Sequence, residues 1–380
     1  MTTETVFTNA RLVLRDGIVE GSLVVADGRI RAIDGGPTSV PSAIDLGGAL
    51  LIPGLIELHT DNMEKHLVPR PGVLWPQPVA AILAHDLQIA GAGITTVYDA
   101  ITIGEYHENS LRRRILADSV EAVTKARTDG LLRADHLIHL RCELSDPAVV
   151  DMWTPYVDNP LVVLVSLMDH TPGQRQWRDI SKMVQYNKLE GWSPERLQAY
   201  IDERVERQGI HARPNRESIL AMFAPRGLPL ASHDDTLVEH VDEAVGDGVL
   251  ISEFPTTVEA ARAARDKGMA IVMGAPNVVR GGSHSGNVSA LDLAGEGLLD
   301  GLSSDYVPAS LLQSAITLNR DLAIALPDAI GLVTTNVADM LGLDDRGEIA
   351  VGRRADLVQV DIVDAVPVVR TVWREGMRVC

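Results

Sequence analysis

Four side chains of the types that bind metal ions lie within eight residues of one another near the start of the chain. In the stretch "LIPGLIELHTDNMEKH", residues 51–66, a hydrophobic run leads into His59, Asp61, Glu64 and His66. Residues two apart on an extended strand point to the same side, so His59 and Asp61 can grip one ion together. Imidazole and carboxylate ligands suit Zn²⁺, Mn²⁺ or Fe²⁺, and such a site needs no cysteine.

Further donors recur at the ends of later hydrophobic runs. They are Glu143, Asp169, His170, His233, Asp234, Asp235, Glu253 and Asp305. Taken alone, each is as well explained by a core or surface position, and Asp234 and Asp235 could simply cap the helix that follows them. The other histidines are assigned to such roles: His85, His107, His136, His139, His211 and His240. The recurrence of donors at the same end of several strands nevertheless predicts a metal centre.

A second pattern favours the binding of an anion. The stretch "GAPNVVRGGSHSGN", residues 274–287, joins Arg280 to Gly281, Gly282, Ser283 and His284. Glycine lets backbone N–H groups approach a phosphate, while hydroxyl and guanidinium groups add donors. A loop without any ligand would have a similar composition.

Other polar and basic residues follow two more of the strands. They are Lys65, His66 and Arg70 after the first and Gln174 and Arg175 after the fourth. Isolated basic residues usually lie on a solvated face. Their recurrence at one rim predicts a clamp for a small phosphorylated substrate.

The pattern of hydrophobic runs predicts parallel β/α units. Eight runs occur at 51–59, 93–101, 136–144, 161–169, 227–235, 248–255, 269–277 and 298–306. Helical stretches separate most of them, which favours an α/β fold of the (β/α)₈ TIM-like barrel type, whose chemistry gathers at the carboxyl ends of the strands. An open doubly wound sheet is the alternative, although no Gly-x-Gly-x-x-Gly follows the first run.

Both ends of the chain read as short alternating strands with Asp-Gly turns. We therefore expect a small β-sandwich domain built from residues 1–50 and 345–380, beside a barrel over residues 51–344. Residues 171–222 are charged and prone to form helices, which predicts a helical insertion, too long for an ordinary loop.

Composition excludes several classes of partner. The 380-residue chain has a net charge of −18, which argues against nucleic acid and membrane surfaces, both polyanions. Its 2 cysteines favour a reducing cytoplasm. Neither a signal peptide nor an apolar run of about 18 residues is visible, so we expect no membrane span.

The chain resembles the amidohydrolase superfamily in "PGLIELHTD", in the strand-end donors and in the return to a β-domain through "GEIAVGRRADLV". More narrowly, it resembles the PhnM-type diphosphatases of this superfamily. The motifs that carry the narrower likeness are "HTDNMEKH", "SLMDHTPGQRQ", "ASHDD", "GAPNVVRGGSHSGN" and "SSDYVPASLL". The likeness extends over nearly the whole chain.

The resemblance implies one or two divalent ions, most simply Zn²⁺, with Mn²⁺ or Fe²⁺ as alternatives. The ligands it implies are His59, Asp61, Glu143, His233 and Asp305, with His170 as a substitute on the second metal because Glu253 stands where many relatives have histidine. It implies hydrolysis of α-D-ribose 1-methylphosphonate 5-triphosphate to the 5-phosphate and pyrophosphate, in the carbon–phosphorus lyase pathway. Asp305 would accept a proton from water, and His284 is a candidate to protonate the pyrophosphate.

Two other functions remain open at this point. A cyclic amidase or deaminase would share the metal site without needing a polyphosphate clamp, and a non-catalytic barrel scaffold would usually have lost the ligands. The resemblance also implies a homodimer.

Overall fold

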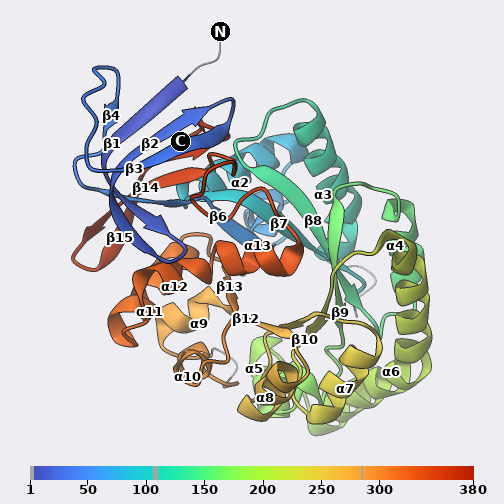
Figure 1. Ribbon diagram of the computed structural model, residues 1–380. Coiled ribbons are helices and arrows are strands. Elements are labelled where there is room, and N and C mark those ends of the chain that lie inside the picture. Colours follow the sequence, from blue (N-terminus) through green and yellow to red (C-terminus); the bar gives the residue numbers. More distant parts are fainter. Residues whose placement is uncertain (1–3, 106–109, 284–285) are drawn as a thin grey trace.

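The computed structural model describes residues 4–105, 110–283 and 286–380. Eight parallel strands follow one another in chain order around one sheet. They are β6 (Leu55–Thr60), β7 (Ile94–Ile103), β8 (Asp135–Glu143), β9 (Val162–Met168), β10 (Leu230–His233), β11 (Ile251–Glu253), β12 (Ala270–Gly274) and β13 (Gly301–Ser303). The predicted eight-stranded barrel is confirmed, with each expected hydrophobic run supplying one strand (Figure 1).

The first and last strands meet through a short parallel bridge between Thr60 and Asp305. The backbone N–H of Asp305 donates to the carbonyl of His59 at 3.1 Å, and the N–H of Asp61 donates to the carbonyl of Asp305 at 3.1 Å. These two hydrogen bonds nearly close the barrel. The same bonds bring together His59, Asp61 and Asp305, three predicted site residues from opposite ends of the barrel sequence.

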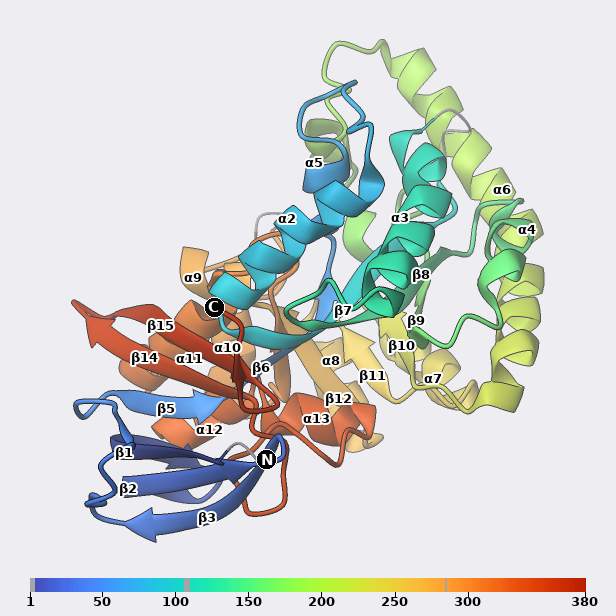
Figure 2. The ribbon, with the colours of Figure 1, turned by 90° about the horizontal axis from the view of Figure 1, so that it is seen from above.

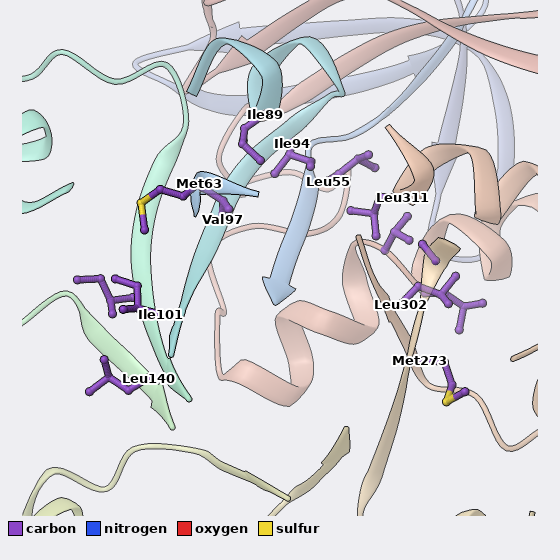
Figure 3. Packing of buried hydrophobic residues seen from close by; sticks show 14 of the residues in the cluster. Leu55, Met63, Ile89, Ile94, Val97, Ile101, Leu140, Met273, Leu302 and Leu311 are labelled. Carbon is purple, nitrogen blue, oxygen red and sulfur yellow. The ribbon is translucent and has the colours of Figure 1, made fainter. Parts of the chain in front are cut away.

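Helices cover the outside of the barrel, so its strands are buried on both faces, as parallel strands usually are. Among them are α2 (Pro78–Gly91), α3 (Leu111–Thr128), α7 (Val238–Gly246), α8 (Val258–Asp266) and α11 (Ser310–Asp321). Every residue of β6 and of β7 is buried. Figure 3 shows Leu55, Ile94 and Leu302 among the aliphatic side chains that fill the layer between strands and helices.

Strands from the two ends of the chain form a separate, mostly antiparallel sheet, as expected for the small terminal β-domain. These strands are β1 (Glu4–Leu14), β2 (Gly17–Ala26), β3 (Arg29–Gly35), β4 (Ile44–Asp45), β5 (Leu50–Pro53), β14 (Leu357–Val363), β15 (Val366–Arg374) and β16 (Met377–Arg378). β5 pairs with both β1 and β14, so it joins the two ends of the chain. Phe7 and Trp373 pack edge to face in the core of this sheet, with ring centroids 4.9 Å apart.

The segment between β9 and β10 contains η2 (Arg175–Trp177), α5 (Ile180–Tyr186) and the long helix α6 (Pro194–Phe223). Ser193 caps α6 by accepting a hydrogen bond from the N–H of Arg196 at 3.3 Å. Figure 2 shows α6 along the outside of the barrel, on the side away from the terminal sheet. No helix in the described part of the chain is long and apolar enough to cross a membrane.

Candidate active site

A cavity of about 480 Å³ lies at the carboxyl ends of the barrel strands. All six residues predicted to bind metal line it: His59, Asp61, Glu143, His170, His233 and Asp305. They come from the ends of β6, β8 and β10 or from the residues just after β6, β9 and β13. The chemistry therefore gathers at the edge of the barrel where the sequence places it.

Two imidazoles and one carboxylate meet in this cavity. Nε2 of His170 lies 3.6 Å from Oδ2 of Asp234, and Nε2 of His233 lies 3.5 Å from the same oxygen. That oxygen is buried, and no described group hydrogen-bonds to it. We call His170, His233 and Asp234 the cavity cluster.

The spacing in the cavity cluster fits a metal ion better than direct hydrogen bonds. Ligand atoms about 2.1 Å from one tetrahedrally coordinated Zn²⁺ lie about 3.4 Å from each other. The 3.5 and 3.6 Å separations are close to this value and longer than good hydrogen bonds. The donor set is thus one that a divalent ion would satisfy, and Asp234, which the sequence equally allowed as a helix cap, belongs to it.

Glu253 lies behind the cavity, fully buried inside the barrel. One of its oxygens is 2.8 Å from Nδ1 of His59, and the other is 3.2 Å from Nδ1 of His233. The hydroxyl of Ser166 donates to it as well, at 2.7 Å. An imidazole that donates from Nδ1 to a carboxylate keeps the lone pair on Nε2 for a metal ion. Glu253 therefore orients the imidazoles of His59 and His233.

Glu143 holds the third imidazole in a similar way. Its Oε2 lies 2.7 Å from Nδ1 of His170, and its Oε1 accepts the backbone N–H of the same residue at 3.1 Å. Burial works to lower the pKa of His170, but the carboxylates of Glu143 and Asp234 outweigh burial and raise that pKa to about 9. The two carboxylates thus favour a cation between them.

Asp305 lies where several negative charges converge. Burial raises its pKa to about 7, and the nearby carboxylates of Asp61 and Asp234 add to this effect. The residue also has a left-handed backbone, with φ 52°, and Asp234 has φ 58°. Such conformations are strained for residues other than glycine and often occur at functional sites. At these two strand ends they turn carboxylates toward the cavity.

Positive side chains also line the cavity, but most are not the predicted ones. Of the predicted substrate contacts, Arg280, Gly282 and Ser283 reach it. Sequence reasoning missed three arginines: Arg112 of α3, Arg141 of β8 and Arg204 of α6. A signal existed for Arg141, since it precedes Glu143 by two residues on one strand and must face the same way.

The structure does not bring the other predicted substrate contacts to the cavity lining. Gly281 ends the short helix α9 (Ala275–Arg280) with φ 76°. Arg175 is buried, and its guanidinium is 2.8 Å from Asp235. Gln174 donates to Asp169 at 2.8 Å. His284, the candidate proton donor, lies outside the described residues.

The remaining three lie on or after the short helix α1 (Met63–Leu67). Lys65 is exposed, and its ammonium group donates to the carbonyl of Tyr306. Arg70 is exposed as well. His66 has Nε2 3.0 Å from Oε1 of Gln88. Their proposed contacts with substrate remain predictions.

A second group of the same residue types is enclosed in the barrel wall. Asp99 of β7 accepts from Nε2 of His85 at 2.8 Å and from Nδ1 of His136 at 2.7 Å. Nε2 of His136 faces Asp86 at 3.3 Å. We call His85, Asp99 and His136 the wall cluster; all three side chains are fully buried, and the cavity lining includes none of them.

The chain is similar to known proteins in sequence and in fold. The amidohydrolase family model matches residues 202–380. The chain is 45% identical over 377 residues to α-D-ribose 1-methylphosphonate 5-triphosphate diphosphatase of Escherichia coli (strain K12), covering 98% of this chain and 100% of that protein. It is 25% identical to imidazolonepropionase of Deinococcus deserti, covering 95% of this chain and 92% of that protein.

Among solved structures, 5-methylcytosine deaminase from Klebsiella pneumoniae matches with a TM-score of 0.67 and 16% identity, over 100% of this chain and 97% of that one. N-acetylglucosamine-6-phosphate deacetylase from Pasteurella multocida matches with a TM-score of 0.65 and 14% identity, over 99% of each chain. These two similarities support the fold alone. The full-length relative and the family model show that the chain belongs to the amidohydrolase superfamily and, within it, to the family of the α-D-ribose 1-methylphosphonate 5-triphosphate diphosphatases, hydrolases that act on phosphorus anhydrides.

Proposed function

We propose that this chain hydrolyses α-D-ribose 1-methylphosphonate 5-triphosphate to the 5-phosphate and pyrophosphate, in phosphonate degradation by the carbon–phosphorus lyase pathway. The observation that carries the proposal is the 45% identity over nearly the full length of both proteins. The cavity supports it, because metal-type donors and arginines line the same space. A cyclic amidase or deaminase needs the metal-type donors but not the arginines.

The residues that would hold a divalent ion are His170, His233 and Asp234, with His59, Asp61 and Asp305 beside them in the same cavity. We propose Zn²⁺ as the ion, with Mn²⁺ or Fe²⁺ as alternatives and with one or two ions in the site. When bound, such an ion lowers the pKa of a water molecule from about 15.7 to about 7 and offsets charge on phosphoryl oxygens. Glu253 and Glu143 keep the imidazoles oriented by accepting hydrogen bonds from Nδ1.

Asp305 would take the proton from the attacking water. Its pKa of about 7, raised first by burial, suits a group that accepts and returns a proton near neutral pH. The water oxygen forms a bond to phosphorus while the bridge between the first and second phosphates breaks, so that pyrophosphate leaves. Arg280 and the backbone at Gly282 and Ser283 would contact the phosphates, because they line the cavity beside the donors.

The test is a phosphorus NMR assay with the purified protein and α-D-ribose 1-methylphosphonate 5-triphosphate. We expect pyrophosphate and the 5-phosphate when Zn²⁺ or Mn²⁺ is added. Absence of pyrophosphate with either metal would refute the substrate assignment, and a parallel screen of nucleobases and hydantoins would then test the amidase and deaminase alternatives.

Asp305→Asn is the matched variant for the same assay. The amide is similar in shape to the carboxyl but cannot accept the proton, so we expect turnover to fall by about 10³-fold with the fold unchanged. Turnover like that of the wild type would remove Asp305 from the mechanism. We further propose a cytoplasmic homodimer, which size-exclusion chromatography with light scattering can test.

A further inference from the structure

Arg141 is a buried cation that the proposed mechanism has not used. It lies on β8, and its inward-facing neighbours along the strand are His139 and Glu143. The side chain is only 10% exposed, yet it lines the cavity. A guanidinium withdrawn from water to this extent loses much of its hydration, which must be replaced by other contacts.

The contacts made by Arg141 leave most of its hydrogen-bonding capacity unused. Its nearest carboxylate oxygen is Oδ2 of Asp61, 4.0 Å from Nη1, which is too long for a hydrogen bond. Its Nε is buried and has no hydrogen-bond partner within the described ranges. Arg175 shows the usual alternative for a buried arginine, because its Nη1 lies 2.8 Å from Asp235 and 3.0 Å from the carbonyl of His233.

The position of Arg141 is next to the groups that would perform the reaction. It lines the same cavity as His59 and Asp305, and its Nη1 lies 4.0 Å from Oδ2 of Asp61. Arg112 approaches from α3 on the same side, with Nη2 3.7 Å from Oδ2 of Asp61. Two guanidinium groups therefore flank one ligand carboxylate at the point where an anion must approach the donors.

Arg112 differs from Arg141 in one respect. Its Nε already donates to Glu64 at 3.1 Å, and its side chain is 37% exposed. Of the two arginines, Arg141 thus has the greater unused capacity and the drier surroundings, in which a hydrogen bond to an anion is stronger. Guanidinium groups suit phosphate because their planar donors can bind two oxygens at once.

We propose that Arg141 is a catalytic residue that binds the non-bridging oxygens of the phosphoryl group attacked by water, and that Arg112 assists it from the rim. This inference rests on the proposed function and specifies which cation meets the reacting phosphate. As the bond to water forms and the bridge to pyrophosphate breaks, Arg141 stabilises negative charge on those oxygens without taking up or releasing a proton.

The test compares Arg141→Met and Arg141→Lys with Arg346→Lys. Arg346 is a largely buried arginine that pairs with Asp135 at the amino end of β8, outside the cavity lining. We expect Arg141→Met to lower kcat/KM for triphosphate hydrolysis by about 10²–10³-fold, mostly in kcat, since such losses follow the removal of one donor to a developing charge. Arg141→Lys should recover part of the loss, because it keeps the charge but not the paired donors. Arg346→Lys should leave kcat and KM within about 3-fold of the wild type, in the range of substitutions remote from the chemistry.

Two further measurements separate this role from a structural one. Metal content, measured by elemental analysis, should stay the same in Arg141→Met, whereas a loss of metal would mean that Arg141 only positions Asp61 and would overturn the inference. Inorganic triphosphate binding, followed by calorimetry on the metal-loaded protein, should weaken by at least about 10-fold, as expected when a charged contact to phosphate is lost.

Unchanged kinetics together with unchanged triphosphate affinity would also overturn the inference. If the wild type fails to hydrolyse the proposed substrate but Arg141→Met still weakens triphosphate binding, the proposed function is wrong and the anion site stands. The two failures can therefore be told apart.

Discussion

The cavity cluster and the wall cluster contain the same residue types, but their aspartates differ in how completely they are hydrogen-bonded. Each joins two histidines to one aspartate. In the wall cluster both oxygens of Asp99 accept hydrogen bonds, at 2.8 and 2.7 Å. In the cavity cluster Oδ2 of Asp234 lies between two imidazoles at 3.5 and 3.6 Å, and no described group completes it. Residue types alone thus do not define a metal site; the unused lone pairs do.

The physical reason for the difference is the surroundings of each cluster. The wall cluster lies between α2, β7 and β8, where three elements pack closely and both oxygens of Asp99 find partners in the protein. The cavity cluster lies at strand ends, beside open space. A buried carboxylate oxygen without a partner destabilises the folded protein unless a bound ligand supplies that partner. Such an oxygen therefore indicates a binding site.

The largest effect that this comparison predicts is on metal binding. His170→Ala should remove one imidazole from the cavity cluster, abolish binding of a stoichiometric divalent ion and reduce hydrolysis by about 10³-fold or more. His85→Ala should leave metal content unchanged, because the wall cluster lies outside the cavity and both oxygens of its aspartate are already hydrogen-bonded. Elemental analysis and calorimetry measure both. Equal metal loss in the two variants would remove the distinction between the clusters.

The next largest effect concerns the free energy of unfolding. Asp99→Asn breaks a buried pair and leaves the charge on His136 without its nearest partner, so we expect a loss of about 3–5 kcal/mol. Asp234→Asn in the metal-free protein should cost much less, because one oxygen of Asp234 has no hydrogen bond to lose. Chemical denaturation of the metal-free proteins tests this difference, and similar losses in both variants would contradict it.

The wall cluster should also make stability depend on pH. Burial works to lower the pKa of His136, but Asp99 and Asp86 outweigh it and raise that pKa from 6.5 to about 9. A raised histidine pKa stabilises the folded state fully below pH 6.5, and the gain is lost as the pH rises through about 9.

We therefore expect the free energy of unfolding to fall by about 3 kcal/mol between these pH values through this one group. Denaturation curves at several pH values should show a weaker fall in His136→Gln. If the two proteins show the same slope, the charge on His136 does not contribute.

The smallest effect is expected at the surface end of the wall. His66 contacts Gln88 and lies 3.4 Å from Nδ2 of Asn62, which in turn contacts His85 at 3.1 Å. His66→Asn should therefore change KM and kcat by less than about 3-fold, as surface substitutions usually do. A rise in KM above tenfold would instead support the prediction from sequence that His66 binds substrate.

Much of the fold could be predicted because it depends on local patterns. Buried parallel strands need continuous apolar runs, and each of the eight runs became a strand. The Asp-Gly pair at Asp27 and Gly28 predicted a hairpin, and both residues have the positive φ that this turn requires. The single terminal sheet was less predictable, since the pairing of β5 with both β1 and β14 depends on contacts between distant segments.

The donors of the site were largely predictable from the sequence, whereas most of its cations were not. Parallel strands bring their carboxyl ends to one edge, so donors at those ends must meet whatever the details of packing. Basic side chains are long, and the direction in which each points depends on which carboxylate it pairs with. Arg175 pairs with Asp235, whereas Arg141, two residues before Glu143 on the same strand, lines the cavity.

The neighbours Asp234 and Asp235 show where local information ends. The chain alone established an acidic pair at the end of a barrel strand. Their different roles appear only in the folded protein. Asp235 accepts hydrogen bonds from Arg175 and Ser252, whereas the left-handed backbone of Asp234 turns its carboxylate toward two imidazoles. Spacing along the chain sets which residues reach the same edge, but the direction of each side chain is decided by backbone strain and partners that come from distant segments.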